Sequence, residues 1–192
     1  MKKEIFKNDL KSYLLVLVLG ITAGLLVAFF SRFPSDDLWS FALFSSVSLG
    51  FWFFSSSLIA LFSSKNYVAG INVAIYVYFM FYITGIFKYL TMVNKGYQTM
   101  SYFYKGLSEN LFYGLIPAIV CFALAFVLWY GRKDKMPYKI IRYLPALMIF
   151  IELLNYSFKL FTVRQGLFML IIDSLCFITY MIIISSKKRI KK

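Results

Sequence analysis

Two carboxylic acids lie inside long apolar stretches of the sequence, and their side chains could carry proton or cation chemistry. Glu152 falls in the apolar run 144–161 and Asp173 in the run 167–185. An ionisable group at bilayer depth costs at least about 2.5–3.5 kcal/mol on insertion scales, so such residues are candidates for a functional site. At a rise of 1.5 Å per residue, both carboxyls are expected roughly 13–14 Å below the outer ends of their helices. The short turn at 162–166 makes these helices antiparallel neighbours, which allows the carboxyls to meet.

Two carboxyls that share a low-dielectric site do not both ionise unless a cation is present. One of them would take a proton and donate a hydrogen bond. We therefore consider a proton or cation site, a clamp for a basic substrate, and a structural polar cluster that joins helices. Asn155 and Lys159 follow Glu152 at i+3 and i+7, and they predict a polar stripe that leads toward the outer surface.

Further candidate binding residues lie in the second and third apolar runs. The second run carries serines close to Gly50 and Trp52, namely Ser45, Ser48, Ser55 and Ser56. Membrane serines commonly bond to helix carbonyls, and the alternative is a polar wall of a ligand cavity. Lys88 is expected near the outer end of the third run, where its side chain either snorkels to the interface or joins the site.

Catalytic motifs are lacking. The chain has no histidine, which removes the commonest general base and the commonest metal ligand. Cys121 and Cys176 lie in apolar runs, where thiols behave as small buried hydrophobes. We expect no enzyme activity, no cofactor and no metal. A carboxyl pair of the aspartyl-protease kind needs no histidine, so an intramembrane enzyme that uses Glu152 and Asp173 stays as an alternative.

Composition predicts the fold class. The chain has 192 residues, of which 61% are hydrophobic and 15% charged, whereas a soluble domain has about 25% charged and about 45–50% apolar residues. The apolar runs are each about 18 residues or longer. We predict an all-α integral membrane protein, a compact bundle of six transmembrane helices that forms a single domain over 1–192. The predicted spans are 13–30, 38–62, 67–90, 111–130, 144–161 and 167–185.

The basic residues predict the orientation. Of the 21 Lys and Arg residues, all but six fall on the side of the two termini. The six are Arg32, Lys88, Lys95, Lys105, Lys159 and Arg164. The positive-inside bias therefore places both termini in the cytoplasm. This topology explains the net charge of +13 without a nucleic-acid partner, and the Lys, Ile, Phe and Tyr bias favours a bacterial plasma membrane.

Local signals predict how the spans begin and how they are connected. Ser35 would cap the second helix, with Asp36 and Asp37 in its first turn. Pro145 fits the first turn of the fifth helix, and Pro117 is expected to kink the fourth. The connection 91–110 is the only long one, and we expect it to cover an outward-facing cavity.

Small residues form a stripe on the first helix. Gly20, Gly24 and Ala28 recur at four-residue spacing, which lets another backbone approach closely. The stripe predicts a helix–helix seam within the protein, and the alternative is docking of another membrane protein.

Three functions are compatible with this sequence. The first is a small-molecule or ion binding and transport component, with a cavity walled by the second, third, fifth and sixth helices. In architecture it resembles the membrane-embedded substrate-binding subunits of energy-coupling-factor vitamin importers, and the resemblance implies an ATPase module as partner. The second is an accessory, regulatory or immunity protein that docks through its first or second helix. The third is the carboxyl-pair enzyme. The expected partners are the lipid bilayer, another membrane protein or an ATPase module, and a small-molecule or cation ligand.

Overall fold

The protein folds as a bundle of apolar helices. The computed structural model describes residues 4–44, 49–133 and 135–186. Within these ranges it contains six α-helices and no strand beyond an isolated bridge between Phe6 and Ser63. The α-helices are α1 (Leu10–Phe30), α2 (Leu49–Phe62), α3 (Asn66–Asn94), α4 (Met100–Leu128), α5 (Met136–Val163) and α6 (Leu167–Ser185), and two 3-10 turns are η1 (Phe41–Leu43) and η2 (Trp129–Arg132).

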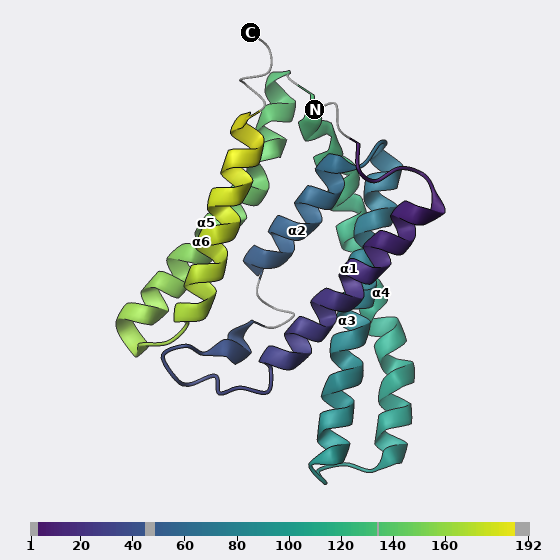
Figure 1. The fold of residues 1–192 in the computed structure, drawn as a ribbon, viewed down its shortest axis with the longest axis vertical. Helices are drawn as coiled ribbons and strands as arrows, with labels where there is room; N and C mark the ends of the chain where they lie inside the picture. The colour runs from purple at the N-terminus through teal and green to yellow at the C-terminus, as the bar shows by residue number, and fades with distance from the viewer. Residues whose placement is uncertain (1–3, 45–48, 134, 187–192) are drawn as a thin grey trace.

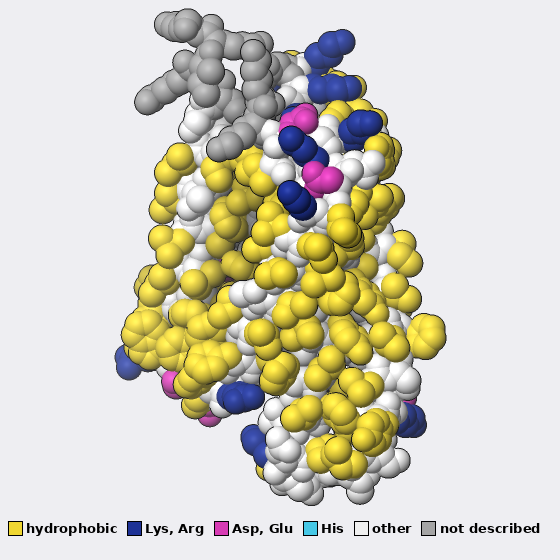
Figure 2. Space-filling model, turned by 45° about the vertical axis from the view of Figure 1, so that its right-hand side comes forward, with side chains coloured by type: hydrophobic (Ala, Val, Ile, Leu, Met, Phe, Trp, Pro, Cys, Tyr) yellow, Lys and Arg dark blue, Asp and Glu magenta, His cyan; other side chains and the backbone are white. Residues whose placement is uncertain are grey.

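Five of these helices are long and apolar enough to cross a membrane, namely α1, α3, α4 with η2, α5 and α6. Helix α2 is apolar too, but its 14 residues extend only about 21 Å, less than the ~30 Å of a bilayer core. Figure 2 shows hydrophobic side chains over most of the visible face, with charged side chains gathered toward its upper and lower ends. The architecture is therefore that of an all-α bundle consistent with a multi-pass membrane protein.

The second predicted span is not one continuous helix. A single helix over 38–62 is expected from the sequence, but the described part of this span is an irregular stretch, the turn η1 and the short helix α2. Ser40 has a left-handed backbone with φ 47°, which no helix interior allows. The predicted cap at Ser35 is also wrong, because Asp37 instead accepts a hydrogen bond from the Ser40 amide.

Contacts with helix α6 explain why the stretch before η1 is not helical. The amides of Leu167 and Phe168 begin α6 and have no partner within it. They donate to the carbonyls of Leu38 and Trp39 at 3.1 and 3.3 Å. An aromatic cluster formed by Phe30, Phe41, Phe44 and Phe168 holds the same stretch against α1 and α6. Tertiary contacts thus replace helical bonds that this apolar sequence could have made.

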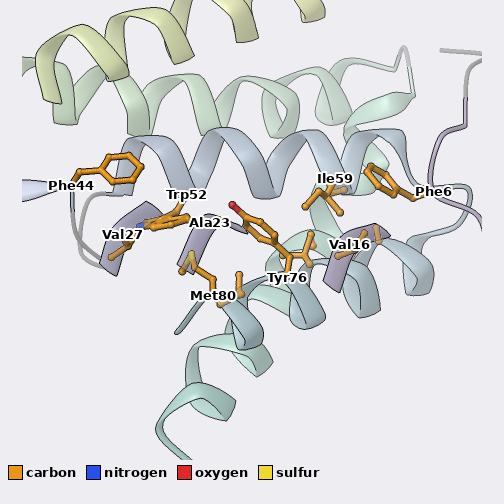
Figure 3. Close-up of a cluster of buried hydrophobic side chains, with 14 of the residues drawn as sticks. Phe6, Val16, Ala23, Val27, Phe44, Trp52, Ile59, Tyr76 and Met80 are labelled. Carbon is orange, nitrogen blue, oxygen red and sulfur yellow. The ribbon is translucent and has the colours of Figure 1, made fainter. Parts of the chain in front are cut away.

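Helix α2 is the central element of the bundle. It contacts α3, α4, α5 and α6, and Figure 1 shows it between the α5–α6 pair and the group of α1, α3 and α4. Its lower face packs on a buried cluster that includes Trp52, Ile59 and Tyr76. In Figure 3 the Tyr76 hydroxyl points up toward α2, where it donates to Ser55 Oγ at 2.9 Å. A short helix is thereby held inside a ring of longer ones.

Helices α3 and α4 form a long hairpin where a long loop was predicted. Helix α3 continues to Asn94 and α4 begins at Met100, so most of 91–110 is helical and only 95–99 connects the two. Gly96 ends α3 with φ +73°, a conformation that favours glycine. Gly106 lies so close to the Tyr89 ring that a β-carbon there would be 2.6 Å from it. Such close packing keeps the outer turns helical, and the hairpin extends beyond the other helices in Figure 1.

The prolines of α5 also differ from expectation. The helix begins at Met136 with Pro137 in its first turn, and Pro145 lies in the helix interior. The stretch 138–143, which precedes the predicted span 144–161, is therefore helical. Arg142 within it is buried and donates from Nε to the Gly131 carbonyl at 2.5 Å, which fixes η2 against the start of α5.

Candidate functional site

The N-terminus of α2 meets Glu152 from α5. The Leu49 amide donates to Glu152 Oε1 at 3.0 Å, and the Gly50 amide donates to Oε2. The first amides of a helix have no partner within it and together carry a partial positive charge. A carboxyl group from another helix therefore caps α2, and the two amides offset part of the cost of burying its charge.

Asp173 of α6 lies on the other side of the same glycine. A β-carbon built on Gly50 would overlap Asp173 Oδ1, so this carboxyl rests directly on the α2 backbone. The charges of Asp173 and Glu152 act on each other. The structure thus brings together the two carboxyls that the sequence singles out, and it adds the first turn of α2 between them.

Asp173 is fully buried, and neither of its oxygens has a hydrogen-bond partner among the residues that the structure describes. A buried polar group without a partner loses its bonds to water and gains none, which costs roughly 1–3 kcal/mol and more for a charge. Glu152 is half-buried by comparison. The two acids therefore differ. Glu152 caps α2 by accepting two amide hydrogen bonds, whereas Asp173 accepts none from the described residues.

The polar stripe predicted along α5 is not formed as expected. Asn155 is exposed, and Tyr156 is the buried residue on the Glu152 side of the helix. Lys159 Nζ lies over the Tyr156 ring, 5.3 Å from its centroid. Its charge acts on Glu152, but among the described residues it makes no ion pair with either carboxyl. The described contact of the Lys159 ammonium is therefore with the Tyr156 ring.

Several other candidates lie away from the carboxyls. Lys88 is exposed near the C-terminal end of α3. Ser55 donates back to the Phe51 carbonyl at 2.8 Å, which is the ordinary structural use of a helical serine. Ser45 and Ser48 lie outside the described residues. Trp52 is buried one turn into α2, where its ring contacts Phe44, Phe51 and Tyr76.

Gly20 and Gly24 of α1 lie against the backbone of α3. A β-carbon at Gly20 would be 2.6 Å from the Tyr76 carbonyl oxygen, and one at Gly24 would be 2.7 Å from that of Met80. Ala28, one turn further, is buried. The small-residue stripe therefore occupies an intramolecular contact between α1 and α3.

A cavity of about 430 Å³ begins at the same end of α2. Helices α2, α3, α4 and α5 wall it, with Leu49, Trp52, Val77, Cys121, Leu124 and Met148 among the lining residues. Hereafter it is called the apolar groove. The apolar groove differs from the expected cavity in two ways. Helix α4 forms a wall where α6 was expected. The groove also lies in the half of the bundle toward η2, where Arg132 forms an ion pair with Glu4. The long covering loop that was predicted over 91–110 is instead mostly helical, and no residue of 91–110 is among the residues that line the groove.

Sequence reasoning missed the backbone part of the site. The amides of Leu49 and Gly50 donate to Glu152, and Tyr156 is near enough to both carboxyls for their charges to act on it. The only signal for them was the presence of Gly50 within an apolar run. In the described parts of the chain, no cluster of three or more Cys, Asp or Glu side chains could hold a metal ion.

Comparison with protein-family models, curated proteins and solved structures finds no match to this chain.

Proposed function

We propose that this chain is a membrane-embedded binding and transport component for a small cationic or protonatable solute, with Glu152 and Asp173 as its binding groups. The proposal includes six membrane crossings, both termini in the cytoplasm and a bacterial plasma membrane as location. The observation that carries it is Asp173, which is fully buried, accepts no hydrogen bond from the described part of the chain and lies beside a second carboxyl.

The broken second span supports a binding role over a purely structural one. Transporters often form their sites where a helix is interrupted within the membrane, because the free backbone groups there can contact a solute. Here Glu152 accepts from the free amides of α2, so the helix end compensates part of one negative charge. Within residues 4–44, 49–133 and 135–186, Asp173 accepts no such hydrogen bond. A cation or a proton at Asp173 would compensate its charge.

A structural polar tie between helices would leave different contacts. Its polar groups would be bonded to each other, because an unbonded group weakens the helix contact that it is meant to hold. Asp173 makes no bond to α2 or α5 in the structure. Its position on Gly50 is therefore better explained by a solute that completes its bonding.

The test is cation-dependent stability of the purified protein in lipid nanodiscs. We expect the thermal midpoint to rise with one of Na⁺, K⁺ or methylammonium, or with falling pH, because a ligand at 100 times its Kd stabilises the folded state by about 2.7 kcal/mol. Asp173→Asn should keep the fold and lose this response, since an amide cannot titrate or balance a positive charge.

Glu109→Gln provides the matched control. Glu109 has an exposed carboxyl on α4, and its Oε1 lies 3.8 Å from Lys105 Nζ. Removing this charge should leave the cation-dependent or pH-dependent rise of the thermal midpoint intact. A wild-type protein that responds to none of these ions and to no pH change would contradict the proposal, as would an Asp173→Asn variant that responds as the wild type does. Either result would favour an accessory protein that acts by helix docking.

A further inference from the structure

Asp173 is covered by the backbone of α2. Both of its carboxyl oxygens are buried, and a β-carbon built on Gly50 would overlap its Oδ1 atom. Helix α6, which carries Asp173, is held at its start by the bonds that Leu167 and Phe168 donate to the stretch before η1. A solute therefore does not reach this carboxyl in the position of α2 that the structure shows. The element whose movement would uncover Asp173 is α2.

The apolar groove leaves room for such a movement. A helix that is closely packed on every side has no room to shift, whereas α2 borders a space of about 430 Å³. The α2 residues that line this space are Leu49, Trp52, Phe53, Ser56 and Ser57. The other described lining residues come from α3, α4 and α5 and none from α6, and α2 lies between α6 and the group that contains α4 (Figure 1). A shift of α2 into the groove is therefore a shift away from Asp173.

The far end of α2 is held by side chains from η2. The Ser63 carbonyl directly follows the last residue of α2, and it accepts hydrogen bonds from Trp129 Nε1 at 2.9 Å and from Arg132 Nη1. The last carbonyls of a helix have no partner within it and carry a partial negative charge, which a guanidinium complements. Helix α2 is thus capped by an acid from α5 at its start and by a cation from η2 at its end.

The chain before α1 adds to this hold. The amides of Ile5 and Phe6 donate to the Phe62 carbonyl at 3.1 and 3.3 Å. The Phe6 side chain is buried, and Glu4 Oε1 lies 3.4 Å from Arg132 Nη2. Hereafter the α2 anchor comprises Glu4, Ile5, Phe6, Trp129 and Arg132. It binds the helix roughly 21 Å from the amides that meet Glu152, so it fixes α2 where the groove does not.

We propose that α2 is the gate of the carboxyl site. This inference rests on the proposed function, and it adds how the site opens. In the closed position, which the structure shows, α2 covers Asp173 and its first amides bond Glu152. In the open position α2 lies further into the apolar groove and its start is separated from α6. The α2 anchor favours the closed position, and Arg132 is a positioning residue that acts on the site through the helix.

Cys176 reports on this opening without any bound solute. It is buried and lies one turn after Asp173 on the inner face of α6. Once Cys121 is replaced by alanine, it is the only cysteine of the chain. The experiment measures the rate at which 2-aminoethyl methanethiosulfonate, a small cationic thiol reagent, modifies Cys176 in nanodiscs. This rate is proportional to the fraction of molecules in which α2 has moved away.

Arg132→Gln tests the α2 anchor. We expect it to raise the modification rate about tenfold, because the loss of one hydrogen bond to a charged group is sufficient for such a ratio. Arg132→Lys keeps the charge at the end of α2 and should raise the rate less. Lys133→Gln is the matched control, since Lys133 is the next residue but its ammonium lies over the Tyr130 ring, outside the α2 anchor.

Filling the apolar groove should have the opposite effect. Cys121 lines the groove from α4, so Cys121→Phe removes the same thiol as Cys121→Ala and also occupies the space that α2 would enter. We expect Cys121→Phe to lower the rate about tenfold relative to Cys121→Ala, with Arg132 or with Gln at position 132. Leu124→Phe, at a lining position that is 56% exposed, repeats the test with less demand on the core.

The outcomes separate the gate from the proposed function. Equal rates in Arg132→Gln and Lys133→Gln, or rates that neither groove-filling change lowers, would overturn the gate. A cation response of the thermal midpoint that is lost in Asp173→Asn would in that case still support the proposed function. Rates that change as expected in a protein without any cation or pH response would support the movement of α2 and contradict the proposed function.

Discussion

At the scale of single residues, Gly50 determines whether the two carboxyls can share one site. It supplies an amide to Glu152, and its missing side chain leaves room for Asp173. Any larger residue would place carbon where Asp173 Oδ1 now lies. The site therefore depends on three residues from three helices, one of which contributes only backbone.

We expect Gly50→Ala to destabilise the protein by about 1–3 kcal/mol, the usual cost of overpacking a filled interior. The added methyl group must displace the Asp173 carboxyl, so the variant should also lose cation-dependent stabilisation. Thermal or denaturant unfolding in nanodiscs measures the first effect.

A double-mutant cycle tests whether the loss of stability in Gly50→Ala comes from the contact with Asp173. In an Asp173→Ala background the methyl group has space, so Gly50→Ala should cost clearly less there than in the wild type. Equal costs in both backgrounds would mean that the glycine acts through α2 alone and not through Asp173.

At the scale of elements, close backbone contacts hold the bundle together. Without a hydrophobic driving force between helices in lipid, small residues let dispersion contacts accumulate. Gly20 and Gly24 allow the close contact between α1 and α3, and Gly106 allows the close contact between α3 and α4. Helix α2 packs against α3, α4, α5 and α6. The residue at which α2 begins determines which backbone amides have no partner within the helix.

We expect Gly24→Ala to lower the free energy of unfolding by about 1–3 kcal/mol. The added β-carbon would lie 2.7 Å from the Met80 carbonyl oxygen, a backbone atom that cannot rotate away, so α1 must shift from α3. Leu25→Ala is the control one position along, because Leu25 is 43% exposed. Similar losses for the two variants in a denaturant titration would argue against a tight seam at Gly24.

At the scale of the whole molecule, the first and last described residues lie at the same end of the bundle, and the α3–α4 hairpin extends from the opposite end. The apolar groove is in the half nearer the chain ends, in the part where α4 and α5 approach η2. With the proposed orientation, the apolar groove would therefore lie in the cytoplasmic half of the bundle.

We expect a cysteine at Lys95, in the connection between α3 and α4, to react with an impermeant thiol reagent in intact cells. A cysteine at Lys135, before α5, should react only after permeabilisation. Cys121 and Cys176 are replaced by alanine in both variants. Labelling at Lys135 in intact cells would reverse the proposed orientation and, with it, the side on which the groove lies.

The sequence by itself determined the helical class, the approximate positions of five long helices and the two acids worth attention. Those features follow from local composition: runs of apolar residues long enough for a bilayer, and charged residues too costly to place in them without a reason. Glu152 and Asp173 were recognisable because each is conspicuous within its own helix.

Only the tertiary structure decided where α2 begins, that 100–110 is helical and which helices wall the groove. The residues 38–44 are as apolar as a helix requires, but their carbonyls pair with the start of α6 and their rings with Phe30 and Phe168. These partners are distant in the chain, so the pattern of residues within a single segment cannot predict the contacts. The same holds for the cap of α2, since an amide becomes a binding group only when folding leaves it unpaired beside a carboxylate from another helix.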